Sequence, residues 1–303
     1  MIFLRILSGK ERKVKEAIVA ISKNKYEGDA IKESLSLLPM DKIIDNTTTV
    51  LITPNWVQSK DPRTGVVVGP ESLRELIRFV KDKNPDRIII ATGSADGTVK
   101  VMKERGYKKV LDEEMVEFVD LNHGPFITLP LEHNSPSSTK INKIIEEIDV
   151  LISYTQLKVH SEATVSLAIK NIAMGWPPTE EHGAPKKNTG IHNDLHGFIR
   201  AMAEKLPIDI SIISGDQALV GKGPSGGKPV NSDIVIAGTD PVASDVVAAR
   251  LLGFKPQAVG YLYQLINKGI GEGDIDRIDI RGLSLKEAGS IFTKAAYDYE
   301  IDI

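Results

Sequence analysis

The sequence predicts an α/β protein with a mainly parallel, doubly wound sheet and helices on both of its faces. Short apolar runs, such as residues 49–53 (TVLIT) and 87–91 (RIIIA), alternate with segments of helical periodicity. The chain has 303 residues, 41% of them hydrophobic, and can therefore bury a substantial core. We expect a single α/β domain over residues 1–303, or two lobes with a boundary near residue 150.

The first half of the chain begins with an apolar run followed by charged residues, which predicts a strand over residues 1–7. A proline at position 70 opens a segment whose Leu73, Leu76 and Ile77 lie on one apolar stripe, as in an amphipathic helix. The other elements expected here are helices over 13–23, 31–38 and 141–148 and another ending at 105, strands over 49–53, 87–91, 116–120 and 149–153, and an extended segment over 126–132.

The second half continues the alternation. Val165, Ile169 and Ile172 share one face of a helix expected within residues 160–174. The Pro- and Gly-rich segment that follows, residues 175–190, is long for a loop, and such loops are either lids over a site or disordered. The remaining elements expected outside the stretch 209–253 are helices over 191–206, 257–267 and 285–297 and a strand over 278–281.

The stretch from residue 209 to residue 253 organises the chain. We expect one apolar strand to end at residues 214–216, and a second, 234–237, to lead into a helix that begins with the Thr-Asp-Pro of residues 239–241. That helix is apolar on most sides, so it should be buried. Asp245 lies within it, and a buried carboxylate is costly unless it is paired, hydrogen-bonded or bound to a cation.

Polar residues follow most of the expected strands. In open parallel sheets, ligands bind beyond the carboxyl ends of the strands, so these residues should converge on one edge if the strands are parallel. The polar strand ends are Pro54-Asn55, Gly93-Ser94, the segment from Gln156 to His160, Asp216 and Thr239-Asp240.

Composition excludes several classes of function. The chain has no cysteine, so disulfides, thiolate nucleophiles and a cysteine-ligated iron–sulfur cluster are ruled out. The net charge of −3 argues against a general nucleic-acid binder. The apolar run at the start is too short for a signal peptide or a membrane span, so we expect a cytoplasmic protein without a membrane partner.

The glycine-rich loop of residues 221–227 matches the letters of the dinucleotide-binding motif G-x-G-x-x-G. That motif requires a helix directly after the loop, and here Lys228-Pro229 leads into another strand, so we reject a dinucleotide site. Two alternatives remain. The loop either lets its backbone approach an anion, with Lys222 nearby, or is a turn between two strands.

His192 and His196 are four residues apart in an expected helix and so should share a face, which is a spacing used by metal sites. Asn193 stands where the zinc-protease pattern needs glutamate, so no protease is indicated. The alternative is that the two histidines flank the apolar stripe of the helix, beside Leu195 and Ile199.

Lys158 and His160 stand where an open α/β sheet places its site. A lysine there can hold an anion, and a histidine can ligate a metal or move a proton. Glu162, Ser166 and Lys170 form a polar stripe, and for Glu162 we favour a solvated helix face. The pair Lys186-Lys187 in the long loop could equally meet an anion or solvent.

An ordered set of segments resembles the family catalogued as domain of unknown function 362, over about residues 49–282. The matching segments are Gln156-Leu157-Lys158-Val159-His160, Lys170-Asn171, Gly175, His192 or His196, Asp216, Gly223-Pro224 with Gly227, Asp240-Pro241-Val242-Ala243 with Asp245, and Gly253. The chain departs from the family pattern at Thr53, where members often have lysine, and in lacking the cysteine-rich segments that many members carry.

We therefore expect a cleft at the strand ends that binds a small anionic metabolite, together with a divalent metal, and catalyses hydrolysis or isomerisation. The expected catalytic residues are Lys158, His160, Asp216 and Asp245; the expected ligand-binding residues are Asn55, Lys170, Asn171, Gly223, Gly226, Gly227 and Asp240; and the expected metal ligands are His160, His192 and His196.

Two alternatives stay open beside the enzyme. One is a non-catalytic metabolite- or cofactor-binding accessory protein. The other is purely structural, with Asp240 capping a helix and Asp245 paired with a buried lysine or arginine.

Overall fold

The computed structural model describes residues 11–301 and 303, so the strand expected over residues 1–7 lies outside the described residues. One large sheet forms the centre of the molecule, in the order β12-β1-β11-β9-β7-β2-β3-β4. Its strands are β1 (Ile18–Lys23), β2 (Thr49–Pro54), β3 (Arg87–Thr92), β4 (Glu117–Asp120), β7 (Val150–His160), β9 (Ile210–Val220), β11 (Ile234–Gly238) and β12 (Asp279–Gly282).

The mainly parallel α/β sheet predicted from the sequence is confirmed. Strands β9, β7, β2, β3 and β4 are parallel to one another in that order, and β1 is parallel to β12. Strands from before and after residue 150 belong to this one sheet, since β2 pairs with β7, with Val50 opposite Val150. Two short strands, β8 (Thr164–Ser166) and β10 (Lys228–Val230), form hairpins with β7 and β9, and β5 (Phe126–Pro130) pairs with β6 (Ser138–Asn142) in a separate ribbon.

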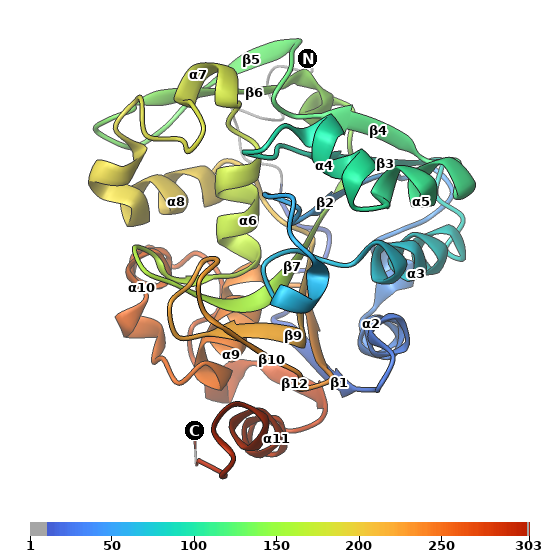
Figure 1. The fold of residues 1–303 in the computed structure, drawn as a ribbon, viewed down its shortest axis with the longest axis vertical. Helices are drawn as coiled ribbons and strands as arrows, with labels where there is room; N and C mark the ends of the chain where they lie inside the picture. The colour runs from blue at the N-terminus through green and yellow to red at the C-terminus, as the bar shows by residue number, and fades with distance from the viewer. Residues whose placement is uncertain (1–10, 302) are drawn as a thin grey trace.

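Helices cover both faces of the sheet (Figure 1). One apolar core lies under α2 (Glu27–Ser36), α3 (Pro70–Lys81), α4 (Thr98–Glu104) and α5 (Tyr107–Glu113). The other lies under α6 (Ala168–Gly175), α8 (Leu195–Ala203), α9 (Pro241–Leu251), α10 (Gly260–Asn267) and α11 (Leu285–Tyr297), and a short helix, α7 (Thr179–His182), lies in the segment between α6 and α8. None of the described helices combines the length and the apolar composition needed to cross a membrane.

β11 runs against its neighbours, which corrects the expectation that all polar strand ends meet at one edge. It pairs antiparallel with both β9 and β1, with Gly238 opposite Ser211 near the start of β9. Thr239 and Asp240 therefore lie at the opposite edge of the sheet from the ends of β2, β3 and β7.

Several element boundaries also differ from the expected ones. Residues 18–23, expected in a helix, form β1, because the run Ile18–Ile21 is buried on both sides, as a central strand requires. The strand expected to end at 214–216 continues as β9 to Val220, past an irregularity in its pairing with β7 between Gln156 and Lys158. The helix expected within 160–174 begins only at Ala168, because β7 extends to His160 and folds back as β8.

Three further segments differ in part. Residues 141–148, expected to be helical, contain the end of β6 and a single 3-10 turn, Lys143–Glu146. The long loop of residues 175–190 contains α7. The helix expected over 191–206 is a 3-10 turn, Ile191–Asp194, followed by α8, since Asp194 accepts a hydrogen bond from the Gly197 N–H and so caps a new helix start.

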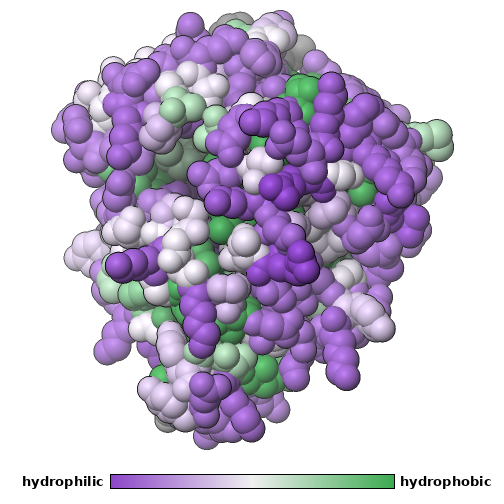
Figure 2. Space-filling view, viewed as in Figure 1, coloured by the Kyte–Doolittle hydropathy of each residue, from purple (hydrophilic) through white to green (hydrophobic). Residues whose placement is uncertain are grey.

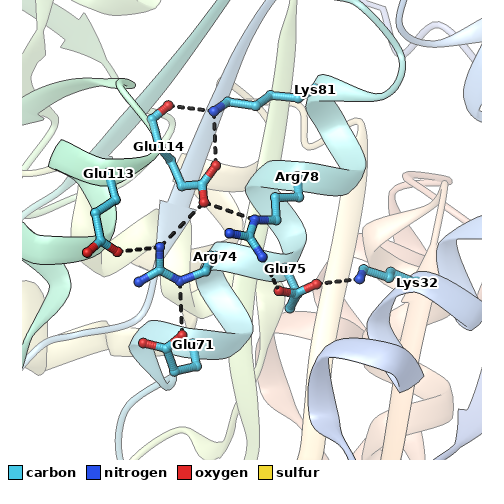
Figure 3. A network of polar contacts seen from close by, with 8 residues as sticks. All are labelled: Lys32, Glu71, Arg74, Glu75, Arg78, Lys81, Glu113 and Glu114. Atoms are coloured by element: carbon cyan, nitrogen blue, oxygen red, sulfur yellow. Dashed lines mark hydrogen bonds and ion pairs between the residues drawn. The ribbon is translucent and has the colours of Figure 1, made fainter.

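A network of ion pairs joins α3 to the end of α5 and to α2 (Figure 3). Glu114, whose side chain is 9% exposed, contacts Arg74, Arg78 and Lys81 of α3. Glu75 of α3 bridges Arg78 and Lys32 of α2. Burial alone would raise the pKa of Glu114, but Lys81 and then Arg78 lower it below the usual value. The network holds α2, α3 and α5 together as one layer over the sheet. Hydrophilic side chains cover most of the face seen in Figure 2.

Candidate anion-binding cavity at the strand ends

A cavity of about 190 Å³ opens at the carboxyl ends of β2, β3 and β7. This is the edge at which a parallel sheet places its ligands. Its apolar wall includes Trp56, Val66 and Met174. Its polar lining includes Asn55, Lys158, His160, Lys170, Asn171, Lys186 and His192, so the structure brings together six of the residues singled out in the sequence as catalytic, ligand-binding or metal-binding.

Three lysines face this cavity from three different segments. Lys158 comes from β7, Lys170 from α6 and Lys186 from the loop after α7. Lys158 donates to the Val66 carbonyl oxygen at 2.8 Å, and Lys186 donates to the carbonyl oxygen of Met174. Within residues 11–301 and 303, none of the three ammonium groups has a carboxylate within 4.0 Å. The cavity is therefore lined by positive charge that the described residues do not neutralise by direct pairing.

Burial disfavours the charged form of each lysine. It lowers the pKa of Lys158 to about 7, with a further contribution from the charge of Lys170. It lowers the pKa of Lys186 to about 7 for the same two reasons. The pKa of Lys170 falls only to about 8, because the carboxylate of Glu162 opposes the effect of burial. An anion placed among these groups would stabilise their protonated forms.

His160 is held as a neutral imidazole with its proton on Nε2. Its Nδ1 accepts hydrogen bonds from the backbone N–H groups of Glu162 and Ala163, both at 3.1 Å, so Nδ1 carries no proton. Burial, and then the charge of Lys170, lower the pKa of His160 to about 3. His160 thus offers the cavity an N–H donor.

The three histidines expected as metal ligands converge on Glu162. The Nδ1 of His192 hydrogen-bonds the Glu162 carboxylate. His196 hydrogen-bonds the backbone of Glu162, and its Nδ1 accepts from the Tyr261 N–H at 3.1 Å. The residues that the structure describes contain no group of three or more His, Asp or Glu side chains that could hold a metal ion. The expectation that His192 and His196 share one helix face is wrong, since the start of α8 separates them. A metal bound by these histidines stays a prediction.

Two asparagines fix the floor of the cavity. Asn55 donates to the Val66 carbonyl oxygen at 3.1 Å and to the Gln156 side chain at 3.2 Å, which ties the end of β2 to β7. Asn171 of α6 donates to the Thr53 carbonyl oxygen at 2.9 Å. Both amides therefore hold the strand ends and α6 in place around the lysines.

Asp245 lies outside the cavity and holds α6 in position. Its carboxyl group accepts hydrogen bonds from the backbone N–H groups of Ala168 and Ile169 and from the Tyr261 hydroxyl, at 2.9 Å, 3.3 Å and 2.9 Å. Burial raises its pKa to about 7, although the Tyr261 hydrogen bond opposes that shift. The structural alternative expected Asp245 to pair with a lysine or arginine, and this partner is wrong. The N–H groups at the start of α6 and the Tyr261 hydroxyl satisfy the carboxyl group instead.

Asp240 and Asp216 also lie outside the cavity. Asp240 caps α9 through the N–H groups of Val242 and Ala243, as the structural alternative proposed, and pairs with Arg12 at 2.9 Å. It stands at the opposite edge of the sheet, so its expected contact with a ligand in this cavity is not supported. Asp216 lies within β9, where burial, and then Glu27, raise its pKa to about 6.

The glycine loop forms the turn of the β9–β10 hairpin, which was the simpler of the two alternatives. A Cβ atom at Gly223 would lie 1.8 Å from the Val159 carbonyl oxygen, so glycine is needed there for the hairpin to pack on β7. Within the loop only Pro224 lines the cavity, so the expected ligand contacts of Gly223, Gly226 and Gly227 are not seen.

Part of the long loop after α6 lines the site, and its role as a lid stays a prediction. Pro185 and Lys186 line the cavity, whereas Lys187 lies 3.9 Å from the Glu162 carboxylate. Sequence reasoning could not separate the two adjacent lysines, because a loop without periodicity carries no information about which side chain points inward. It assigned Glu162 to a solvated face, and this side chain is 45% exposed, but it also contacts His192 from a distant segment, which the sequence did not indicate.

Residues 50–250 match the family described as "Domain of unknown function (DUF362)". The chain belongs to this family. The match spans the strands and helices that build the cavity and confirms the resemblance seen in the sequence.

One curated protein and one solved structure are similar to this DUF362 protein. It is 23% identical over 253 residues to a thylakoid-associated protein of Synechocystis sp., a match that covers 80% of this chain and 77% of the relative. It is similar to the lactate racemase apoprotein from Thermoanaerobacterium thermosaccharolyticum, with 20% identity and a TM-score of 0.46. That match covers 78% of this chain but only 57% of the racemase.

Proposed function

We propose that this protein binds a small anionic molecule in the cavity at the strand ends. The observation that carries the proposal is the set of three buried or half-buried lysines, Lys158, Lys170 and Lys186, without a carboxylate partner among the described residues. Buried charges are normally paired, because removing them from water is costly. An anion in the cavity would supply the missing charge.

The size of the cavity limits the ligand. A water molecule takes about 30 Å³ in the liquid, so about 190 Å³ corresponds to roughly six waters. Such a volume suits phosphate or a short carboxylic acid. The proposal also keeps the expected cytoplasmic location and a small molecule, rather than nucleic acid or a membrane, as the partner.

Calorimetric titration with inorganic phosphate, and separately with acetate, tests the proposal. Replacing Lys170 by methionine should weaken binding at least tenfold, since a hydrogen bond to a charged group contributes about 1.5–3 kcal/mol. Lys222→Met is the matched control, because Lys222 is an exposed lysine of the glycine loop outside the cavity. Equal affinity in the wild type and Lys170→Met would refute an anion site at these lysines.

Binding could be followed by hydrolysis or isomerisation, or by no reaction. The position of His192 in the cavity wall, bonded to Glu162, favours an enzyme. A non-catalytic accessory protein would retain its ligand unchanged. Mass spectrometry of a metabolite extract incubated with the protein separates the two, because an enzyme changes the amount of at least one small anion.

The expected divalent metal is a separate part of the proposal. Elemental analysis of the untagged protein tests it directly. A stoichiometric transition metal would support a metal beside the anion, and a protein that carries none would remove this part of the proposal.

A further inference from the structure

The contact between Glu162 and His192 gives the lysine cavity a second chemical group. Glu162 follows β7 in the turn to β8, and His192 lies in the 3-10 turn before α8. The two side chains meet through Nδ1 of His192 and a carboxylate oxygen of Glu162. The side chain of His192 is 22% exposed and lines the cavity.

The backbone of Glu162 is held from two directions, while its side chain is 45% exposed. Its backbone N–H donates to His160 Nδ1 at 3.1 Å, and its backbone also hydrogen-bonds His196. Its carboxylate is ionised at neutral pH, because the hydrogen bond from His192 lowers its pKa below the usual value. A carboxylate in this state can only accept hydrogen bonds, so Nδ1 of His192 must carry the proton.

The proton on Nδ1 decides what the other ring nitrogen can do. In the neutral form of His192 only one ring nitrogen carries a proton, so in that form Nε2 has a free lone pair. His160 shows the opposite arrangement, because two backbone N–H groups occupy its Nδ1. The cavity is thus lined by one histidine that donates and one that can accept.

We propose that Glu162 and His192 form a proton-accepting pair that acts on the anion held by the lysines. This inference rests on the proposed anion site and adds a chemical step to it. The ligand it fits is a small carboxylic acid with a hydrogen on the carbon next to a carbonyl group. Nε2 of His192 accepts that hydrogen as a proton and the C–H electron pair stays on the ligand as an enolate.

The charges around the cavity suit this step. The imidazolium formed at His192 is stabilised by the Glu162 carboxylate, and the enolate by the ammonium groups of Lys158, Lys170 and Lys186. The N–H of His160 Nε2 provides a further donor. Delivery of that proton from His192 to another atom over which the enolate charge is spread gives an isomer of the ligand, whereas its return to the same carbon restores the ligand; neither outcome needs an oxidant or a reductant. Glu162 is a positioning residue here, and His192 is the group that meets the ligand.

Nitrogen NMR of the full-length protein with ¹⁵N-labelled histidine tests the pair, because protonated and unprotonated ring nitrogens have well-separated shifts. In the neutral form of each ring, His192 should show a protonated Nδ1 and an unprotonated Nε2, and His160 the reverse. Signals are assigned with His160→Gln and His192→Gln. Addition of inorganic phosphate should shift the Nε2 signal of His192.

Two variants of Glu162 separate a specific role from a general structural one. Glu162→Gln keeps an oxygen that accepts from Nδ1–H, so the arrangement of protons on His192 should be unchanged. Glu162→Ala removes the acceptor and should allow His192 to move its proton to Nε2. Circular dichroism melting of both variants checks that they fold.

Each outcome decides the inference. A protonated Nε2 in the neutral wild-type ring would overturn the pair, and so would an unshifted His192 when calorimetry shows that phosphate binds. If calorimetry shows no phosphate binding, the anion site fails, and the proton positions on His192 in the wild type and Glu162→Ala still decide whether Glu162 sets them.

Discussion

At the scale of single residues, the account depends on lysines that burial makes easy to deprotonate. Lys158 and Lys186 have pKa values of about 7 and Lys170 one of about 8. An anion binds their protonated forms, so its affinity should fall as the pH rises from about 6 to 9. At pH 7.5 binding should also take up protons, which calorimetry in buffers of different ionisation enthalpy measures. Affinity that is constant over this pH range would contradict the lysine site.

The same lysines predict how stability depends on pH without a ligand. The folded-state pKa of Lys158 lies below the 10.5 of an unperturbed lysine, so the unfolded state binds more protons between pH 7 and 10.5. The contribution of Lys158 to the free energy of unfolding therefore rises with pH over this window. Lys158→Met should stabilise the unliganded protein by about 1–4 kcal/mol near pH 6.5, because it removes a buried charge. Urea unfolding at pH 6.5 and 9 should show this advantage shrinking as the pH rises.

At the scale of elements, α6 depends on Asp245. Asp245→Ala leaves the N–H groups of Ala168 and Ile169 and the Tyr261 hydroxyl without their acceptor, which should cost about 2–4 kcal/mol of unfolding free energy. It should also weaken phosphate binding, because Lys170 lies on α6. Asp245→Asn keeps one acceptor oxygen and is the matched control in urea unfolding. Equal stability of the wild type and Asp245→Ala would show that α6 does not need this cap.

The helical layer of α3 and α5 gives a second prediction at this scale. Glu114→Ala removes the buried carboxylate that Arg74, Arg78 and Lys81 share and should cost about 1–3 kcal/mol in urea unfolding, since Arg74 keeps Glu113. Glu71 also pairs with Arg74, but its side chain is 76% exposed. Glu71→Ala should therefore change stability by less than about 1 kcal/mol. A cost for Glu114→Ala no larger than that for Glu71→Ala would contradict the role of the network.

Local patterns predicted most elements because each strand and helix carries its own periodicity. They failed where long-range pairing decides. Residues 18–23 are a strand only because β11 and β12 lie beside them, and the reversed direction of β11 moves Asp240 to the far edge. The cavity residues from β2, β7 and α6 were predictable from the rule for parallel strand ends. The roles of Glu162 and Lys186 were not, because they depend on which way a turn and a loop fold.

At the scale of the whole molecule, one parallel half-sheet, a covering helix and a loop surround a single cavity. β2 and β7 supply its floor, α6 its wall and residues 175–190 another part of its lining. The match to the DUF362 family over residues 50–250 includes all of these parts. The fold thus brings three lysines from distant segments to one place, and it is this assembly that we assign to anion binding.

The central claim is that an anion occupies the space among Lys158, Lys170 and Lys186. Anomalous diffraction from a crystal soaked in sodium bromide tests it most directly, since bromide is a small anion that can be located without knowing the natural ligand. The account predicts a bromide peak in the cavity, within contact distance of at least two of the three Nζ atoms, that is absent in Lys170→Met crystals. Bromide peaks on the surface with none in the cavity would contradict it.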